Sequence, residues 1–137
     1  MSRLLLDTTF LIDAERAEEL VDESIDDEDD VAVAAISVAE MKVGVALAAG
    51  RRRGLRHDFI TDVLAVIPVL EYDLNVAEAH AQLLATVPRQ GRPHGAHDLV
   101  IAATAVASGR EVVTADTGGF VDLPGVRVRS HMPGGAR

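Results

Sequence analysis

The chain has 137 residues, of which 48% are hydrophobic and only 3% aromatic, and its formal net charge is -9. This length fits a single domain with an aliphatic core. The acid excess argues against a broad basic face for nucleic acid, and the scarcity of aromatic residues argues against a base-stacking platform for single strands. A site for divalent cations, or a basic protein partner, is compatible with this charge.

The sequence contains no cysteine, which excludes disulfides, thiolate zinc sites and cysteine nucleophiles. The first apolar run, residues 4–6, is too short for a signal peptide or a membrane span, because Asp7 follows it directly. We therefore expect a cytoplasmic protein with no membrane contact.

Short apolar segments alternate with longer segments of helical periodicity along the chain. Strands are expected at residues 4–6, 31–36, 69–70, 112–114 and 126–128. Helices are expected at 10–14, at 17–25, from 37 to 49, before Pro68, after a cap at Asp73, and at 97–108. This alternation predicts a mainly parallel sheet of four to five strands, covered on both faces in a three-layer α/β/α sandwich. The domain is expected to span residues 1–130, followed by a loose tail over 131–137.

Turn-forming residues mark the expected ends of the helices. Gly50 is expected to end the helix that begins at residue 37, and Gly109 the helix at 97–108. Residues 88–95 are expected to form a loop. The five consecutive acids at 26–30 suggest a solvated loop, with a metal-binding loop as the alternative, although they lack the spacing and central glycine of an EF-hand.

Four acids lie near expected element boundaries, and each has an ordinary structural explanation. Asp7 follows the first strand, where it would cap a helix. Glu40 stands three residues after Ser37, which is the spacing of a capping box. Asp98 lies in the first turn of a helix, where the dipole favours an acid, and Asp116 would suit an Asx-turn.

Together these acids predict one site. Asp7, Glu40 and Asp116 follow buried strands, whose carboxyl ends share one edge of a parallel sheet, where such sheets bind ligands. Asp98 begins the helix that leads to the strand at 112–114, so we expect it at the same edge. Converging carboxylates need a counter-charge, and oxygen ligands without sulfur suit Mg²⁺ or Mn²⁺.

In order and spacing these residues resemble the PIN domain. The fragments that carry the resemblance are Asp7-Thr8-Thr9, Glu40 in the second major helix, Asp98 with the apolar segment 99–105, and Val113-Thr114-Ala115-Asp116 followed by Phe120. Together they cover about residues 4–128 and are most similar to the VapC-type toxins of bacterial toxin-antitoxin modules. Each fragment alone is common, but the combination is specific.

The resemblance implies a PIN-like fold and a metal-dependent endoribonuclease that leaves 5'-phosphate and 3'-hydroxyl ends on RNA. It assigns one or two Mg²⁺ or Mn²⁺ ions, and the catalytic work, to Asp7, Glu40, Asp98 and Asp116. It assigns supporting hydrogen bonds to Thr8 and Thr114. It also implies a homodimer, and a small antitoxin protein whose basic segment blocks the acidic pocket.

One position departs from the family pattern. Members often carry a second acid just before the phenylalanine of the last motif, where this chain has Gly119. Four carboxylates remain, so activity is expected, whereas a second metal is expected to bind weakly or only with substrate. The alternative is a non-catalytic module that binds RNA or protein through a degenerate site.

Two other enzyme classes also gather acids at strand ends. A phospho-acceptor receiver domain needs a lysine beyond a late strand, but the only lysine, Lys42, lies too early. A haloacid-dehalogenase-type phosphatase needs a second acid two residues after the first, where this chain has Thr9. Neither class fits the sequence.

Two sets of cationic or titratable residues lie outside this pattern. The only basic cluster consists of Arg51, Arg52, Arg53 and Arg56. We expect it to be a solvated helix face, with RNA phosphate contact as the alternative. His94 and His97 suggest a zinc site or a general base, but their place at a helix start favours a role in beginning the helix, or simple exposure.

Overall fold

The computed structural model describes residues 1–17, 25–90 and 95–131 of the chain. Its strands are β1 (Arg3–Leu6), β2 (Asp30–Ala34), β3 (Val69–Leu70), β4 (Glu111–Thr114) and β5 (Val128–Ser130). Its helices are α1 (Thr8–Ala17), α2 (Ala35–Leu47), α3 (Gly50–Val66), α4 (Leu74–Gln90), α5 (Ala96–Ser108) and the short 3-10 helix η1 (Thr117–Gly119). No helix in these described ranges is both long and apolar enough to cross a bilayer.

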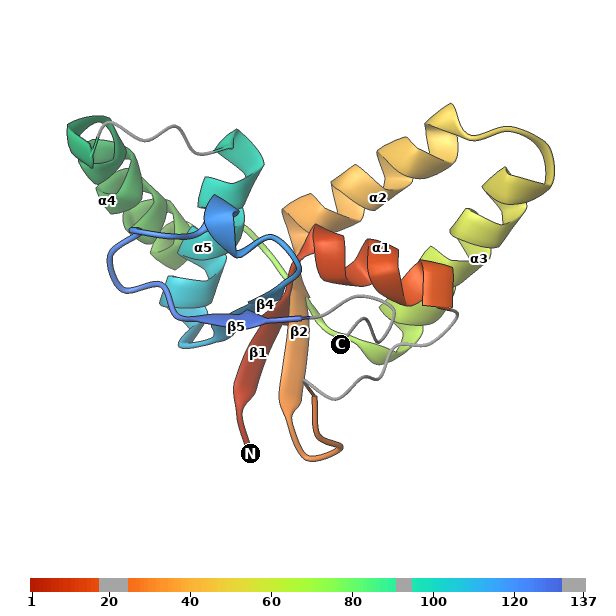
Figure 1. Cartoon of the computed structure of the whole chain (residues 1–137), viewed down its shortest axis with the longest axis horizontal. Coiled ribbons are helices and arrows are strands. Elements are labelled where there is room, and N and C mark those ends of the chain that lie inside the picture. Colours follow the sequence, from red (N-terminus) through yellow and green to blue (C-terminus); the bar gives the residue numbers. More distant parts are fainter. Residues whose placement is uncertain (18–24, 91–94, 132–137) are drawn as a thin grey trace.

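The strands form one parallel sheet in the order β3-β2-β1-β4-β5 (Figure 1). The chain moves outward from β1 to β2 and β3, then returns to the other side of β1 to add β4 and β5. This reversal makes the carboxyl end of β1 the switch point, where open α/β sheets bind ligands. The predicted parallel sheet is confirmed.

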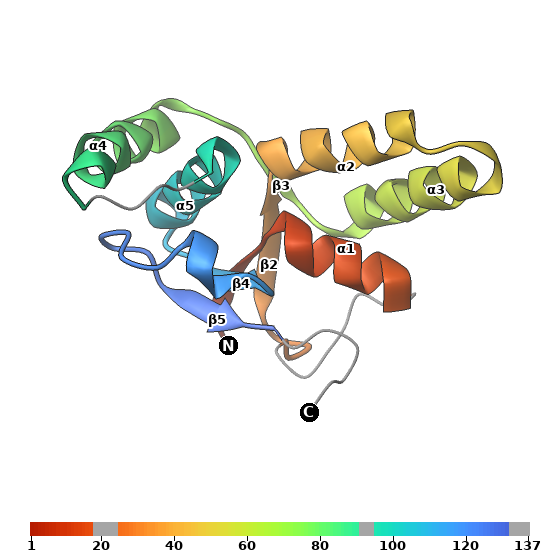
Figure 2. The ribbon, with the colours of Figure 1, turned by 45° about the horizontal axis from the view of Figure 1, so that its top comes forward.

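Different helices cover the two faces of the sheet, as Figure 2 shows. Leu5 lies in one core with Leu83 of α4 and several residues of α5. Leu4 lies in the other core, with Phe10 of α1 and Val63 of α3. Because side chains alternate along a strand and both faces are covered, the strands are apolar throughout. This arrangement is the three-layer sandwich expected from the sequence.

Several expected boundaries are wrong. β2 ends at Ala34 and α2 begins at Ala35, two residues before the expected boundary, so Ser37 lies inside the helix. Gly50 begins α3 rather than ending α2, because its φ of 59° makes the turn between the two helices. The last strand is β5, shifted towards the carboxyl terminus because the amide of His131 donates a 2.8 Å hydrogen bond to the carbonyl of Thr114.

Other expectations fall partly outside the described residues. One helix, α1, replaces the short helix expected at 10–14, whereas the helix expected at 17–25 lies mostly in the undescribed range 18–24. The loop expected at 88–95 begins too early, because α4 continues to Gln90 and residues 88–90 are helical. Within the expected tail, His131 is buried, and residues after it are outside the description.

Arginines hold the amino ends of the central strands. Arg110, only 8% exposed, donates hydrogen bonds to the main-chain oxygens of Leu4 and Asp30 and, at 3.1 Å, to Asp30 Oδ1. Arg129 lies 3.1 Å from Glu111 and 3.8 Å from Asp29. Asp29 and Asp30, which belong to the acidic run expected as a solvated loop, therefore form ion pairs at the amino edge of the sheet.

Candidate active site

Asp7 follows β1 at the switch point and is only 2% exposed. Its Oδ1 accepts hydrogen bonds from the amide of Phe10 at 3.0 Å and from Thr9 Oγ1 at 2.7 Å, so Asp7 caps α1 as predicted. Burial raises the pKa of Asp7 above its ordinary value, and hydrogen bonds from Thr114, Thr9 and Phe10 offset only part of this effect. A nearby cation would favour the charged carboxylate.

A chain of hydroxyl groups joins Asp7 to the segment of Asp116. Thr9 Oγ1 lies 3.2 Å from Thr114 Oγ1, and it accepts a hydrogen bond from the amide of Ala115 at 3.0 Å. Thr114 Oγ1 in turn accepts a hydrogen bond from the amide of Asp116 at 2.9 Å. Within the described residues the Asp116 carboxylate caps nothing in η1, so the expected Asx-turn is wrong.

Glu40 lies in the second turn of α2, where two side chains hold it. Its Oε1 accepts a 2.6 Å hydrogen bond from Thr8 Oγ1, and its Oε2 lies 3.1 Å from His97 Nδ1. The expected capping box is wrong, because α2 begins at Ala35 and Ser37 is not its N-cap. His97 is exposed, as expected, but it also links α5 to α2 through Glu40.

Asp98 lies in the first turn of α5, and Gly119 brings it close to Asp116. A methyl group added at Gly119 would lie 2.7 Å from Asp98 Oδ2 and 3.7 Å from Asp116 Oδ2. Both carboxylates therefore approach the same stretch of backbone, which has no side chain in the way. A side chain at the position that departs from the family pattern would thus contact two of the predicted acids.

The structure links the four predicted acids at the carboxyl edge but does not gather them into a finished cluster. Hydroxyl groups connect Asp7 to the main chain of Asp116, and Asp98 and Asp116 both approach Gly119. Glu40 connects to α1 through its threonine partner. Across residues 1–17, 25–90 and 95–131, no group of three or more acidic, histidine or cysteine side chains has the spacing of a metal site. The donor set still fits a hard divalent ion, since it consists of carboxylate oxygens and includes one buried acid.

Thr9 is the site residue that the sequence interpretation missed. It donates to Asp7 and contacts Thr114, whereas the predicted Thr8 serves Glu40. The signal was present in the sequence, because successive residues of a helix point in different directions and so two adjacent hydroxyls serve two different acids.

The basic cluster divides into two pairs. Arg51 and Arg52 are exposed at the start of α3. Arg53 donates a 2.9 Å hydrogen bond to the carbonyl of Ala48, and Arg56 a 3.1 Å hydrogen bond to the carbonyl of Gly44, both near the end of α2. These two residues therefore have a structural role, and RNA contact by the cluster stays a prediction.

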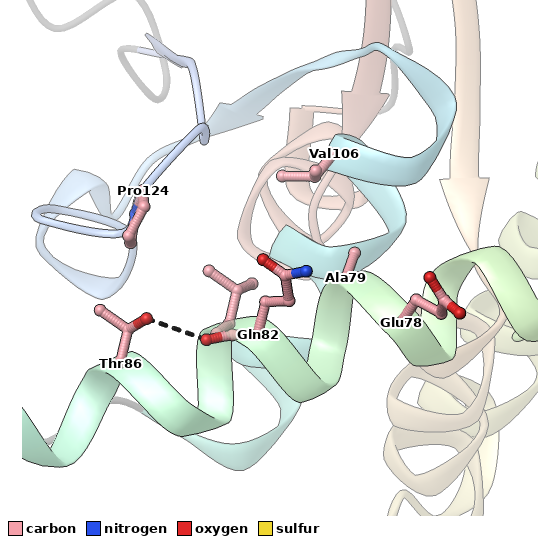
Figure 3. Close-up of a pocket in the computed structure, with 7 residues that line it drawn as sticks. Glu78, Ala79, Gln82, Thr86, Val106 and Pro124 are labelled. Carbon is pink, nitrogen blue, oxygen red and sulfur yellow. Dashed lines mark hydrogen bonds between the residues drawn. The ribbon is translucent and has the colours of Figure 1, made fainter.

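Two hollows differ in their relation to the acids. Figure 3 shows a cleft of about 300 Å³ between α4, α5 and the segment before β5, where Glu78, Gln82, Thr86, Val106 and Pro124 surround it. None of the four predicted acids lines this cleft. A smaller pocket of about 130 Å³ lies between α1, α2 and α3, and Glu40 forms part of its wall.

Comparison with known proteins decides the family. Residues 4–126, which include all four acids, match the family described as PIN domain. The chain belongs to the PIN domain family. The resemblance drawn from the four sequence fragments is therefore confirmed.

Relatives of this PIN domain include a bacterial ribonuclease and a bacterial toxin. It is 39% identical to VapC ribonuclease Y4jK of Sinorhizobium fredii over 92 residues, which are 64% of this chain and 66% of that protein. It is 35% identical to toxin FitB of Neisseria gonorrhoeae over 98 residues, or 67% of this chain and 69% of FitB. The matched segments thus span about two thirds of these relatives.

The fold of this PIN domain also matches solved structures. A member of the VapBC family of toxin-antitoxin systems, VapBC-5 from Mycobacterium tuberculosis, superposes with a TM-score of 0.79 and 26% identity. The superposition covers 96% of this chain and 100% of that chain. The similarity therefore extends over both cores of the sandwich.

Proposed function

We propose that this PIN domain is a VapC-type toxin, a metal-dependent endoribonuclease that hydrolyses RNA phosphodiester bonds. The observation that carries the proposal is Asp7, a buried acid at the switch point that threonine and amide groups hold in one orientation. The relatives support the reaction class, since one bears the name VapC ribonuclease and another the name toxin.

In this proposal Asp7, Glu40, Asp98 and Asp116 hold one or two Mg²⁺ or Mn²⁺ ions. Bound there, such ions supply a water of lowered pKa and positive charge beside the phosphate and the leaving oxygen. The chain itself orients the ligands: the amide of Phe10 fixes Asp7, and Thr8 and His97 fix the two oxygens of Glu40. No side-chain nucleophile is required.

We further propose that a small antitoxin with a basic segment inhibits the protein, and that the toxin is a cytoplasmic homodimer. An arginine binds carboxylates through paired, charge-assisted hydrogen bonds and would compete with metal for the same oxygens. The similarity to a VapBC toxin-antitoxin structure supports a partner of this kind.

The second candidate is a non-catalytic module that binds RNA or protein. Two observations favour it: Gly119 replaces a family acid, and the acids in the described ranges do not yet have metal-site spacing. Cleavage assays separate the two candidates.

The test is incubation of the purified protein with RNA and Mn²⁺, with Asp98→Asn as the matched inactive variant. We expect the wild type to cut RNA and leave 5'-phosphate ends, and we expect EDTA or the substitution to stop cleavage. Cleavage that survives EDTA or Asp98→Asn would rule out the metal-nuclease proposal. Equal Mn²⁺ affinity of the wild type and Asp7→Asn would remove Asp7 from the site.

A further inference from the structure

A small pocket adjoins the acidic edge of the sheet. It has a volume of about 130 Å³ and lies between α1, α2 and α3, which form one side of the molecule in Figure 2. Glu40 stands at one end of it, so the pocket begins where Thr8 holds the proposed metal ligand. Neither the family nor the proposed metal chemistry requires a pocket here.

The pocket runs along two helix faces that lead away from the site. On α1 the face continues from Thr8 to Ile12 and Glu15, since residues three or four apart are neighbours on a helix. On α2 it continues from Glu40 to Gly44, which is about one helical turn, or roughly 5.4 Å. A nucleotide beside the scissile phosphate would reach this far.

The pocket has an apolar interior. Ile60 of α3 is 6% exposed, and Ile12 and Met41 extend this apolar surface towards the opening. Aliphatic side chains of this kind receive the face of a flat ring, whose transfer from water is favourable. A phosphate or a hydrated metal ion would gain nothing from such a surface.

The polar groups of the pocket carry both signs of charge. Arg56 Nη1 donates a 3.1 Å hydrogen bond to the carbonyl of Gly44, and Arg56 Nε lies 3.8 Å from Glu15 Oε2. These contacts hold the guanidinium plane in the wall, while Arg16 is exposed at the opening. Two acids and two arginines balance, so the pocket suits an uncharged group with hydrogen-bonding edges rather than an ion.

We propose that this pocket binds one nucleobase of the RNA substrate, next to the cleaved bond, with Glu15 and Arg16 recognising its edge. Single-stranded RNA is recognised by stacking on aromatic or arginine planes and by hydrogen bonds to the base edges. This pocket has no aromatic residue among its lining side chains, so the Arg56 plane and the aliphatic wall take the face of the base. Because a carboxylate only accepts hydrogen bonds, Glu15 favours guanine, which presents two adjacent N–H donors on its Watson–Crick edge. The inference rests on the proposed ribonuclease function.

The test compares cut sites in a randomised RNA pool for the full chain with Mn²⁺. The wild type is expected to prefer guanine at one position beside the cut by about tenfold, the size of one good edge contact. Glu15→Gln should remove that preference at this position alone, and Arg16→Gln should weaken it. Glu28→Gln, at an exposed acid in the turn before β2 and therefore at the opposite edge of the sheet, is the matched control and should leave the preference unchanged.

The outcomes separate this inference from the proposed function. Unchanged base preference in Glu15→Gln, or an equal loss of cleavage at all sequences, overturns the nucleobase pocket while an inactive Asp98→Asn still supports the nuclease. Cleavage by Asp98→Asn overturns the nuclease itself. Variants that keep their base preference but bind a basic peptide more weakly would assign the pocket to a protein partner and overturn the inference.

Discussion

The two edges of the sheet both gather acids, but they stabilise them differently. At the amino edge, lowest in Figure 1, arginines are the partners: Asp30 pairs with Arg110 and Arg3, and Arg129 lies near Glu111. These ion pairs satisfy the carboxylate oxygens with charged donors. The ion-paired acids of the amino edge therefore stabilise the fold.

At the carboxyl edge the partners are mostly neutral. Asp7 is held by a hydroxyl and an amide, and Glu40 by a hydroxyl and a histidine ring. In the ranges that the structure describes, no arginine or lysine lies within ion-pair distance of Asp7, Glu40 or Asp116. Neutral donors orient a carboxylate without cancelling its charge, which supports the proposal that this edge binds a cation.

The largest expected effect is on cleavage. Asp7→Asn should lower kcat/KM for RNA by roughly 1,000-fold, the size of removing one group that stabilises transition-state charge. Asp30→Asn, at the opposite edge, should leave the activity of the folded protein unchanged. Initial rates of RNA cleavage with Mn²⁺ measure the activity of both variants. An active Asp7→Asn protein would contradict the proposal that the acids of the carboxyl edge, unlike those of the amino edge, take part in cleavage.

The next effect is on stability. Arg110→Met leaves Asp30 and two main-chain carbonyls without their buried donor, and it should lower the free energy of unfolding by about 3 kcal/mol. Urea unfolding measures the loss. Arg127→Met is the matched control, because Arg127 is exposed and should change stability by less than about 0.5 kcal/mol. Equal losses in both variants would show that Arg110 is not a structural partner.

A pH-dependent effect of a few degrees is expected at Asp7. Because its pKa is raised in the folded protein, Asp7 holds its proton to a higher pH in the folded state than in the unfolded state. The free energy of unfolding that this proton contributes is fully present below the ordinary pKa of 3.8 and is lost as the pH rises through the raised pKa. Metal-free Asp7→Asn should therefore melt above the wild type at pH 7, with a difference that narrows as the pH falls towards 3.8.

Thermal unfolding in EDTA measures this difference, and added Mn²⁺ should stabilise the wild type more than the variant. A variant that melts below the wild type at pH 7 without metal would mean that the hydrogen bonds outweigh the cost of burying the charge.

The smallest effect is expected at Gly119. An alanine there places a methyl group 2.7 Å from Asp98 Oδ2, so the carboxylate must move, and Mn²⁺ affinity should fall by about tenfold. Gly118→Ala is the control, because its methyl group would lie at an ordinary 3.5 Å from Asp116 Oδ1. Calorimetric titration compares the two, and equal affinities would show that Gly119 makes no room for ligands.

Local patterns predicted the architecture well but the boundaries less well. Apolar strand-length runs between helical segments were enough to identify a parallel three-layer sandwich, since few other folds bury such strands on both faces. The capping box at Glu40 was wrong because α2 begins at Ala35, two residues earlier than expected, and the apolar run across this boundary does not mark where the strand ends. Gly50 was assigned to the wrong helix because a left-handed glycine can precede a helix as well as end one.

The sequence by itself determined the family, the parallel sheet and the placement of four acids near its carboxyl edge, because strand order and local periodicity are encoded in neighbouring residues. Only the tertiary structure decided which groups hold each acid. Thr8 contacts Glu40, which is 32 residues away in the sequence, and Thr9 contacts Thr114, which is 105 residues away. The spacing of neighbouring residues therefore cannot predict either contact. Those distant partners distinguish the edge that stabilises the fold from the edge proposed to bind a cation.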